Sequence, residues 1–110
     1  MSAEYKRIFY QFAKEVHETA KSKGWWEKPR STAESIALMH SELSEALEAD
    51  RAGNPPDDKI PEFTGIEAEL ADCIIRILDF SIARRYDVIG AMFSKAEMNK
   101  GREYKHGKQY

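Results

Sequence analysis

Cysteine is almost absent from this 110-residue chain, and long apolar runs are absent altogether. The single thiol, Cys73, has no partner for an internal disulfide, and its neighbours Ile74 and Ile75 predict a buried structural residue rather than a nucleophile. No apolar run approaches the roughly 20 residues of a membrane span, and charge interrupts the N-terminal stretch where a secretory signal would be apolar. We therefore expect a cytoplasmic protein that does not associate with membranes.

Proline and glycine are scarce, with four and six residues, and most of them separate segments of helical periodicity. Apolar residues at three- and four-residue spacing predict helices over residues 3–23, 31–52, 64–85 and 87–101. Ser31 and Thr64, each followed three residues later by glutamate, are expected N-caps, and so is Asp87. No strand pattern or internal repeat is found. A chain of this length then predicts one all-α domain over residues 1–110.

Four helices with short connections predict a four-helix bundle. The apolar residues of the third predicted helix occupy too wide an arc to face one small core: Ile74, Ile75, Ile77 and Leu78. A small domain also buries only about two-thirds of its unfolded surface, so association would add stability. We expect the bundle to be completed by oligomerisation, as a homodimer or a homotetramer.

Charge is segregated along the chain, although the formal net charge is only −2. Residues 42–72 hold ten acidic and two basic side chains, a net of −8, whereas residues 73–110 hold four acidic and eight basic ones, a net of +4. Proteins that bind polymeric nucleic acid usually carry a basic excess over the whole domain. The pattern favours a cation site with an anion site beside it, and no polymeric nucleic acid as partner.

Two pairs of carboxylates stand one helical turn apart, Glu42 with Glu45 and Glu69 with Asp72. Exposed glutamates are common on helices, so each residue alone is equally explained as solvated surface. If the second and third helices pack antiparallel, however, all four acids converge. Four like charges repel unless a cation neutralises them, and oxygen ligands suit Mg²⁺ or, as a substitute, Mn²⁺.

The arrangement E-x-x-E, a 23-residue spacer (69 − 45 − 1) and E-x-x-D resembles the MazG-like branch of the all-α nucleoside triphosphate pyrophosphohydrolases. The stretches GWW, LMHSELSEALEADRAG, ELADCIIRILDF and KAEMNKGREYKHGK resemble it too. The resemblance implies hydrolysis of a nucleoside triphosphate, with a deoxynucleoside as the expected substrate, between its α- and β-phosphates. It also implies that the four acids hold Mg²⁺ and that one of them acts as general base. The implied role is nucleotide-pool housekeeping.

A basic stripe in the fourth predicted helix is the expected phosphate site. Lys95, Asn99 and Arg102 follow i, i+4, i+7 spacing, and Tyr104 and His106 lie just beyond. Cations there would neutralise charge on the pyrophosphate leaving group, with the neutral donors completing the contacts. The alternative is a solubilising tail.

Trp25 and Trp26 are adjacent in the connection before the second predicted helix, so their rings are expected to point in different directions. Indole rings stack on nucleobases, and the resembling family holds the base with aromatic residues in this region. We expect a base contact from at least one of the two, with core or interface packing as the alternative.

Two other functions are compatible with parts of the sequence. A helical oligomeric scaffold or partner-binding protein would use the wide apolar arc as its functional surface and leave the carboxylates in solvent. A di-iron carboxylate protein would need an E-x-x-H motif from each of two helices, and this chain has one, Glu103 with His106. His17 and His40 are expected to be helix-surface or satisfied core residues.

Overall fold

The computed structural model describes residues 3–102 and 104. The described chain forms four α-helices and no β-strand, apart from one isolated bridge between Pro56 and Thr64, so the predicted all-α fold is confirmed. The helices are α1 (Ala3–Ser22), α2 (Thr32–Arg51), α3 (Gly65–Arg84) and α4 (Val88–Lys100). Within the described part of the chain, no helix has the length and apolar character needed to span a bilayer.

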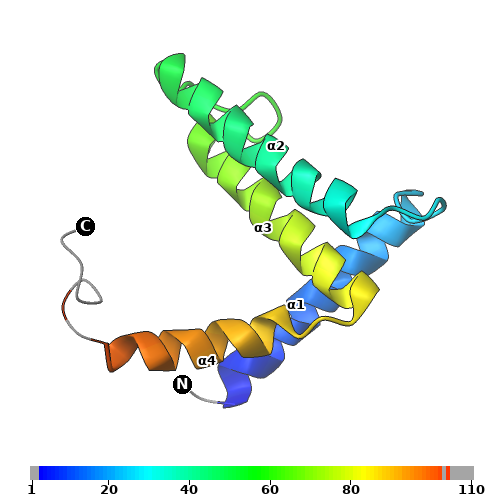
Figure 1. Ribbon diagram of the computed structural model, residues 1–110. Coiled ribbons are helices and arrows are strands. Elements are labelled where there is room, and N and C mark those ends of the chain that lie inside the picture. Colours follow the sequence, from blue (N-terminus) through cyan, green and yellow to red (C-terminus); the bar gives the residue numbers. More distant parts are fainter. Residues whose placement is uncertain (1–2, 103, 105–110) are drawn as a thin grey trace.

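The helices α2 and α3 form an antiparallel hairpin, α1 crosses the end of α3, and α4 lies against α1 (Figure 1). Within one chain the four helices therefore do not close around a common axis. The radius of gyration is 16.3 Å, whereas a compact domain of this length has about 13 Å. The protomer is an open arrangement of an α2–α3 arm and an α1–α4 arm.

The helix starts lie where the capping residues predict them. Ser31 accepts a hydrogen bond from the Glu34 backbone N–H, and Thr64 forms a reciprocal capping box with Glu67. The carboxylate of Asp87 accepts from the Gly90 N–H at 2.8 Å and starts α4.

The loop between α2 and α3 fixes the register of the hairpin. Asn54 adopts a positive φ of 54°, and its side chain accepts a hydrogen bond from the Ile66 N–H at 2.9 Å. The Gly65 N–H donates to the Pro55 carbonyl at 2.8 Å. A Cβ on Gly65 would lie only 2.9 Å from the Ala49 Cβ, so the absence of a side chain lets the two helices approach closely at this end.

The core lies where α1, α3 and α4 meet. It consists of Ala13, Leu78, Ile89 and Phe93, with Tyr10, Val16 and Ile82 packed against it. Cys73 is buried on α3, as predicted.

The predicted apolar stripes are wrong in part, because several of their large residues face outward. On α2 the buried residues are Ser35, Glu42 and Ala46, whereas Ile36, Leu43 and Leu47 are 44–51% exposed. On α3, Leu70 and Ile74 are exposed, and on α1 so are Ile8, Phe9 and Phe12. Several of the residues that are buried in the hairpin are small, among them Ser35, Ala46, Gly65 and Ala68, whereas these larger apolar residues face outward.

Candidate metal centre

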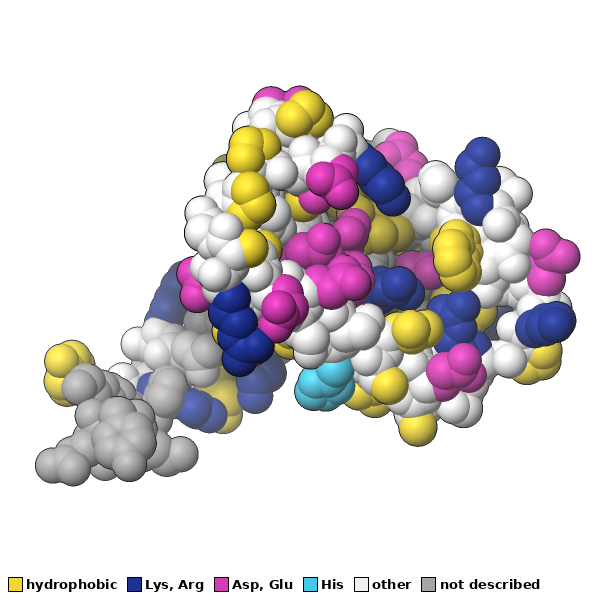
Figure 2. Space-filling model, turned by 90° about the horizontal axis from the view of Figure 1, so that it is seen from above, with side chains coloured by type: hydrophobic (Ala, Val, Ile, Leu, Met, Phe, Trp, Pro, Cys, Tyr) yellow, Lys and Arg dark blue, Asp and Glu magenta, His cyan; other side chains and the backbone are white. Residues whose placement is uncertain are grey.

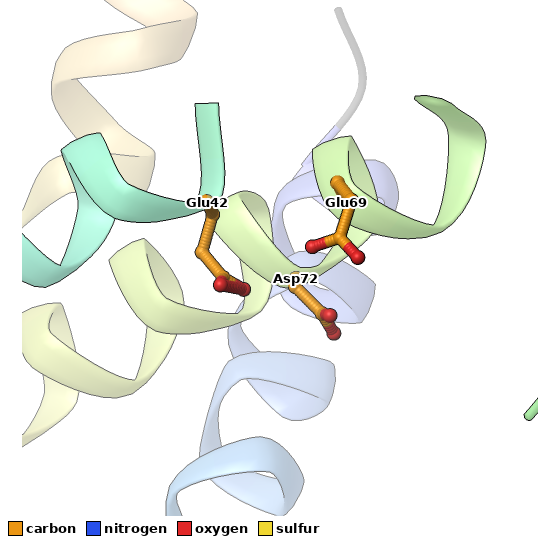
Figure 3. A group of neighbouring side chains, drawn as sticks. All are labelled: Glu42, Glu69 and Asp72. Carbon is orange, nitrogen blue, oxygen red and sulfur yellow. The ribbon is translucent and has the colours of Figure 1, made fainter. Parts of the chain in front are cut away.

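Three of the four predicted acids meet between the helices of the hairpin. Glu42 comes from α2, and Glu69 and Asp72 come from α3, with one oxygen of each carboxylate within 4.8 Å of those of the others (Figure 3). The antiparallel packing of the hairpin places the two motifs opposite each other, as the spacing predicts. No other group of three metal-binding side chains at this spacing exists among residues 3–102 and 104.

Two carboxylates of this cluster, those of Glu42 and Glu69, are partly removed from water, whereas Asp72 is exposed. The Glu42 side chain is only 10% exposed, and burial is the main cause that raises its pKa. The Arg76 guanidinium opposes this rise, and the neighbouring acids Asp72 and Glu45 add to it.

Glu45 is exposed on α2 but lies beside Glu69. Burial, together with the adjacent Glu45 carboxyl group, raises the pKa of Glu69 to about 7. The structure thus brings all four predicted acids into one neighbourhood, with Glu45 at its edge.

Acidic clusters also form on protein surfaces without binding a metal, so the residues themselves must fit the ion. The Glu69 Oε2 atom is buried and has no hydrogen-bond partner. A buried carboxylate oxygen without a donor is costly unless a cation reaches it. All donors in the cluster are carboxylate oxygens, with no histidine or thiolate among them, which suits Mg²⁺ or Mn²⁺ rather than a softer metal.

The cluster opens into a cavity of about 380 Å³ between α1, α3 and the connection that precedes α2. Three acids line this cavity: Glu42, Asp72 and Asp79. The remaining lining residues are Val16, Thr19, Ala20, Lys23, Trp25, Arg30, Ile75 and Arg76. Acidic side chains gather in the middle of this side of the molecule, with basic side chains next to them (Figure 2).

The two tryptophans have different surroundings. Trp25 is 57% exposed and lines the cavity. The Trp26 indole N–H instead donates to both oxygens of Asp79, at 2.9 and 3.0 Å. The guanidinium of Arg30 lies 5.4 Å from the centre of the Trp26 ring. Of the two tryptophans, Trp25 lines the cavity and Trp26 does not.

Several residues that line the cavity lie outside the two acidic motifs and the basic stripe. Arg76 and Asp79 follow Asp72 at i+4 and i+7 on α3, so helical spacing alone places them on the face that carries the acids. That signal is available in the sequence. Lys23 and Arg30 carry no such signal, because only the tertiary packing of α1 and the connection brings them to α3.

The predicted phosphate site lies elsewhere in the protomer. Lys95 and Asn99 are exposed on α4, and Arg102 lies beyond the helix end at Lys100 rather than on the helical face. No residue of α4 lines the cavity. Tyr104 is 88% exposed, and His106 lies outside the described residues.

Comparisons with family models, curated proteins and solved structures give no significant match to this chain. The resemblance to the MazG-like enzymes therefore stays a prediction from the sequence motifs, to be judged with the geometry of the site.

Proposed function

We propose that this chain is a Mg²⁺-dependent nucleoside triphosphate pyrophosphohydrolase that converts its substrate, expected to be a deoxynucleotide, into a nucleoside monophosphate and pyrophosphate. One observation carries the proposal: a semi-buried cluster of three carboxylates opens into a cavity that also holds cationic side chains and an exposed tryptophan. A nucleoside triphosphate needs these three kinds of group together, for its metal, its phosphates and its base. The cavity volume lies within the usual range for small-ligand sites.

Glu42, Glu69 and Asp72 would hold the metal, with Glu45 beside them. Bound Mg²⁺ supplies charge neutralisation at the phosphates and lowers the pKa of a bound water. Manganese, which also prefers oxygen ligands, would substitute.

The reaction adds a water oxygen to one phosphorus of the α–β anhydride, and the bridging oxygen leaves with the other phosphorus. The proton of the water passes to a carboxylate of the cluster that acts as general base. Arg76 and Lys23 line the same cavity and offer donors to the phosphate oxygens, where negative charge accumulates on the leaving group. Trp25 would stack on the base at the exposed part of the cavity.

Oligomerisation is part of the same proposal. The protomer is open, and large apolar side chains on α1, α2 and α3 are exposed, among them Phe12, Leu43 and Ile74. Exposed apolar surface of this extent is typical of association surfaces. A homodimer or homotetramer would cover these side chains and complete the bundle. In such an assembly, α4 of one subunit would reach the cavity of another subunit, although it does not line the cavity of its own chain.

The test is a phosphate-release screen with inorganic pyrophosphatase as the coupling enzyme, across common and modified nucleoside triphosphates, with and without Mg²⁺. We expect release that requires both the metal and the coupling enzyme, with one base preferred. Release without the coupling enzyme would contradict cleavage at the α–β bond. Absence of turnover with either Mg²⁺ or Mn²⁺ would make the leading interpretation an oligomeric scaffold that uses the exposed apolar surface.

A further inference from the structure

Arg76 both pairs with an acid of the carboxylate cluster and lines the cavity. Its Nε atom is 3.8 Å from Oε2 of Glu42, and its side chain is 35% exposed, whereas that of Glu42 is 10% exposed. The distance is that of an ion pair and exceeds that of a hydrogen bond. The arginine is therefore the ion-pair partner of the most buried acid of the cluster.

The same carboxylate is one of those that would hold the divalent cation. A cation at Glu42 and the guanidinium of Arg76 compete for one negative charge, and two positive charges at this separation repel each other. When the carboxylate is neutralised by metal, the guanidinium loses its partner. A phosphate ligand in the cavity that Arg76 itself lines is then an anion with which the guanidinium can pair.

We propose that Arg76 takes the place of the divalent cation beside Glu42 in the metal-free protein and turns to the substrate phosphates once the metal is bound. This inference rests on the proposed function and assigns the phosphate contact to a residue of α3 rather than of α4. The planar guanidinium can donate two parallel hydrogen bonds to two oxygens of a phosphate chain, whereas a lysine ammonium acts as a point charge.

The other cations of the cavity are less suited to this role. Arg30 donates to the Trp25 carbonyl at 3.3 Å and packs over the Trp26 ring. Its guanidinium therefore already binds groups of the connection before α2. Lys23 lies on the loop side of α1 and forms no ion pair with the acids of the cluster. Of these three described cations, Arg76 alone forms an ion pair with an acid of the cluster.

The proposal predicts opposite signs for two binding steps. Removing the guanidinium removes a competitor, so Arg76→Gln should bind metal alone more tightly than the wild type. Removing it also removes a phosphate contact, so the same variant should bind a phosphate chain more weakly. A residue with a purely structural role would weaken both steps or neither.

The experiment uses two calorimetric titrations of the full chain. The first adds Mn²⁺ alone to metal-free protein, and the second adds Mn²⁺-saturated inorganic triphosphate to Mn²⁺-saturated protein. For Arg76→Gln we expect the Mn²⁺ dissociation constant to fall at least about threefold and the triphosphate dissociation constant to rise about tenfold or more. Inorganic triphosphate isolates the phosphate contact, because it carries no base.

Three further variants control for charge and folding. Lys23→Gln removes a charge from the same cavity and should change Mn²⁺ binding less than Arg76→Gln does. Arg51→Gln, which removes an exposed charge paired with Glu48 at the end of α2, should change neither titration. Arg76→Lys keeps the charge and loses the planar fork, so its Mn²⁺ affinity should stay near the wild-type value while triphosphate binding weakens.

The outcomes separate this inference from the function on which it rests. If wild-type protein does not bind Mn²⁺, both the metal centre and the role of Arg76 are refuted. If wild-type protein binds Mn²⁺ but Arg76→Gln binds it no more tightly, or binds triphosphate as well as the wild type does, the role of Arg76 is refuted and the metal centre stands.

Discussion

His17 and Asp79 are 62 residues apart in sequence, yet the His17 Nδ1 atom lies 2.7 Å from Asp79 Oδ1. Both side chains are mostly buried, at 13% and 14% exposed. The same carboxylate accepts the indole N–H of Trp26. One acid of α3 thereby holds α1 and the connection before α2 in place, and these two segments form the wall of the cavity opposite the metal cluster.

We expect Asp79→Asn to lower the free energy of unfolding by about 1 to 2 kcal/mol, because a charge-assisted contact becomes a neutral one. The variant should also raise the Michaelis constant, since Trp25 is carried by the connection that Asp79 holds. Urea unfolding and steady-state kinetics measure the two effects. Asp50→Asn, an exposed acid at the end of α2, is the matched control. A variant with wild-type stability would show that the contact is not structural.

Glu69 predicts a pH dependence of stability in the metal-free protein. Its pKa is raised to about 7 in the folded state, above its ordinary value of 4.5. Between these values the folded state binds more protons than the unfolded state, so the free energy of unfolding falls as the pH rises from about 4.5 to 7. Glu69→Gln removes this effect.

Melting curves in EDTA at pH 5 and pH 8 measure the difference. From pH 5 to pH 8, the wild type should lose at least about 1 kcal/mol relative to Glu69→Gln, which is about 4 °C in Tm. The exposed variant Glu18→Gln should follow the wild type. Parallel pH profiles for the wild type and Glu69→Gln would contradict a raised pKa at this residue.

Two of the proposed metal ligands are tested by isosteric changes. Glu42→Gln and Asp72→Asn keep the shape of the side chain and remove its charge, so turnover should fall at least about 100-fold while the helical circular dichroism is unchanged. Glu48→Gln, an exposed change on the same helix as Glu42, should retain activity. Full activity in either ligand variant would refute the metal assignment.

Lys95 tests whether α4 acts on the site of another subunit. We expect Lys95→Ala to raise the Michaelis constant and to lower turnover, although Lys95 does not line the cavity of its own chain. Lys100→Ala, on the same helix and paired with Glu97, is the control. Unchanged kinetics in Lys95→Ala would assign the basic stripe to the solvated surface.

The exposed apolar side chains of the hairpin predict the assembly. Light scattering after size exclusion should give two or four times the 12.6 kDa chain mass, and the double change Leu43→Lys with Leu47→Lys should reduce it to that of a single chain. Ser44→Lys introduces one lysine at a neighbouring exposed position without removing an apolar side chain, and it should leave the assembly intact. A monomeric wild type would contradict the oligomeric part of the proposal.

The sequence predicts those features that depend on local chemistry. Capping by Ser31, Thr64 and Asp87 depends on contacts within one turn, and the convergence of Glu42 with Glu69 follows from helical spacing plus an antiparallel hairpin. Both kinds of prediction agree with the structure.

The features that the sequence does not predict depend on how helices pack. Leu43 and Ile74 continue apolar stripes but face outward, whereas the small residues Ala46 and Ala68 are buried in the hairpin. Lys23 and Arg30 reach the cavity through the crossing of α1 over α3, for which helical periodicity has no signal. The crossing angle of two helices depends on the side chains of both helices, so the apolar stripe of a single helix does not predict that angle.

The order of the helices also bears on how the chain folds during synthesis. The hairpin of α2 and α3 joins neighbouring segments, and its loop is closed by the hydrogen bonds of Asn54 and Gly65. The partners of α1, by contrast, are α3 and α4, which are synthesised after α2. The face of α1 that packs on them therefore stays exposed to solvent until both helices have left the ribosome. During that interval the α1 segment is open to chaperones and to premature pairing with a second copy.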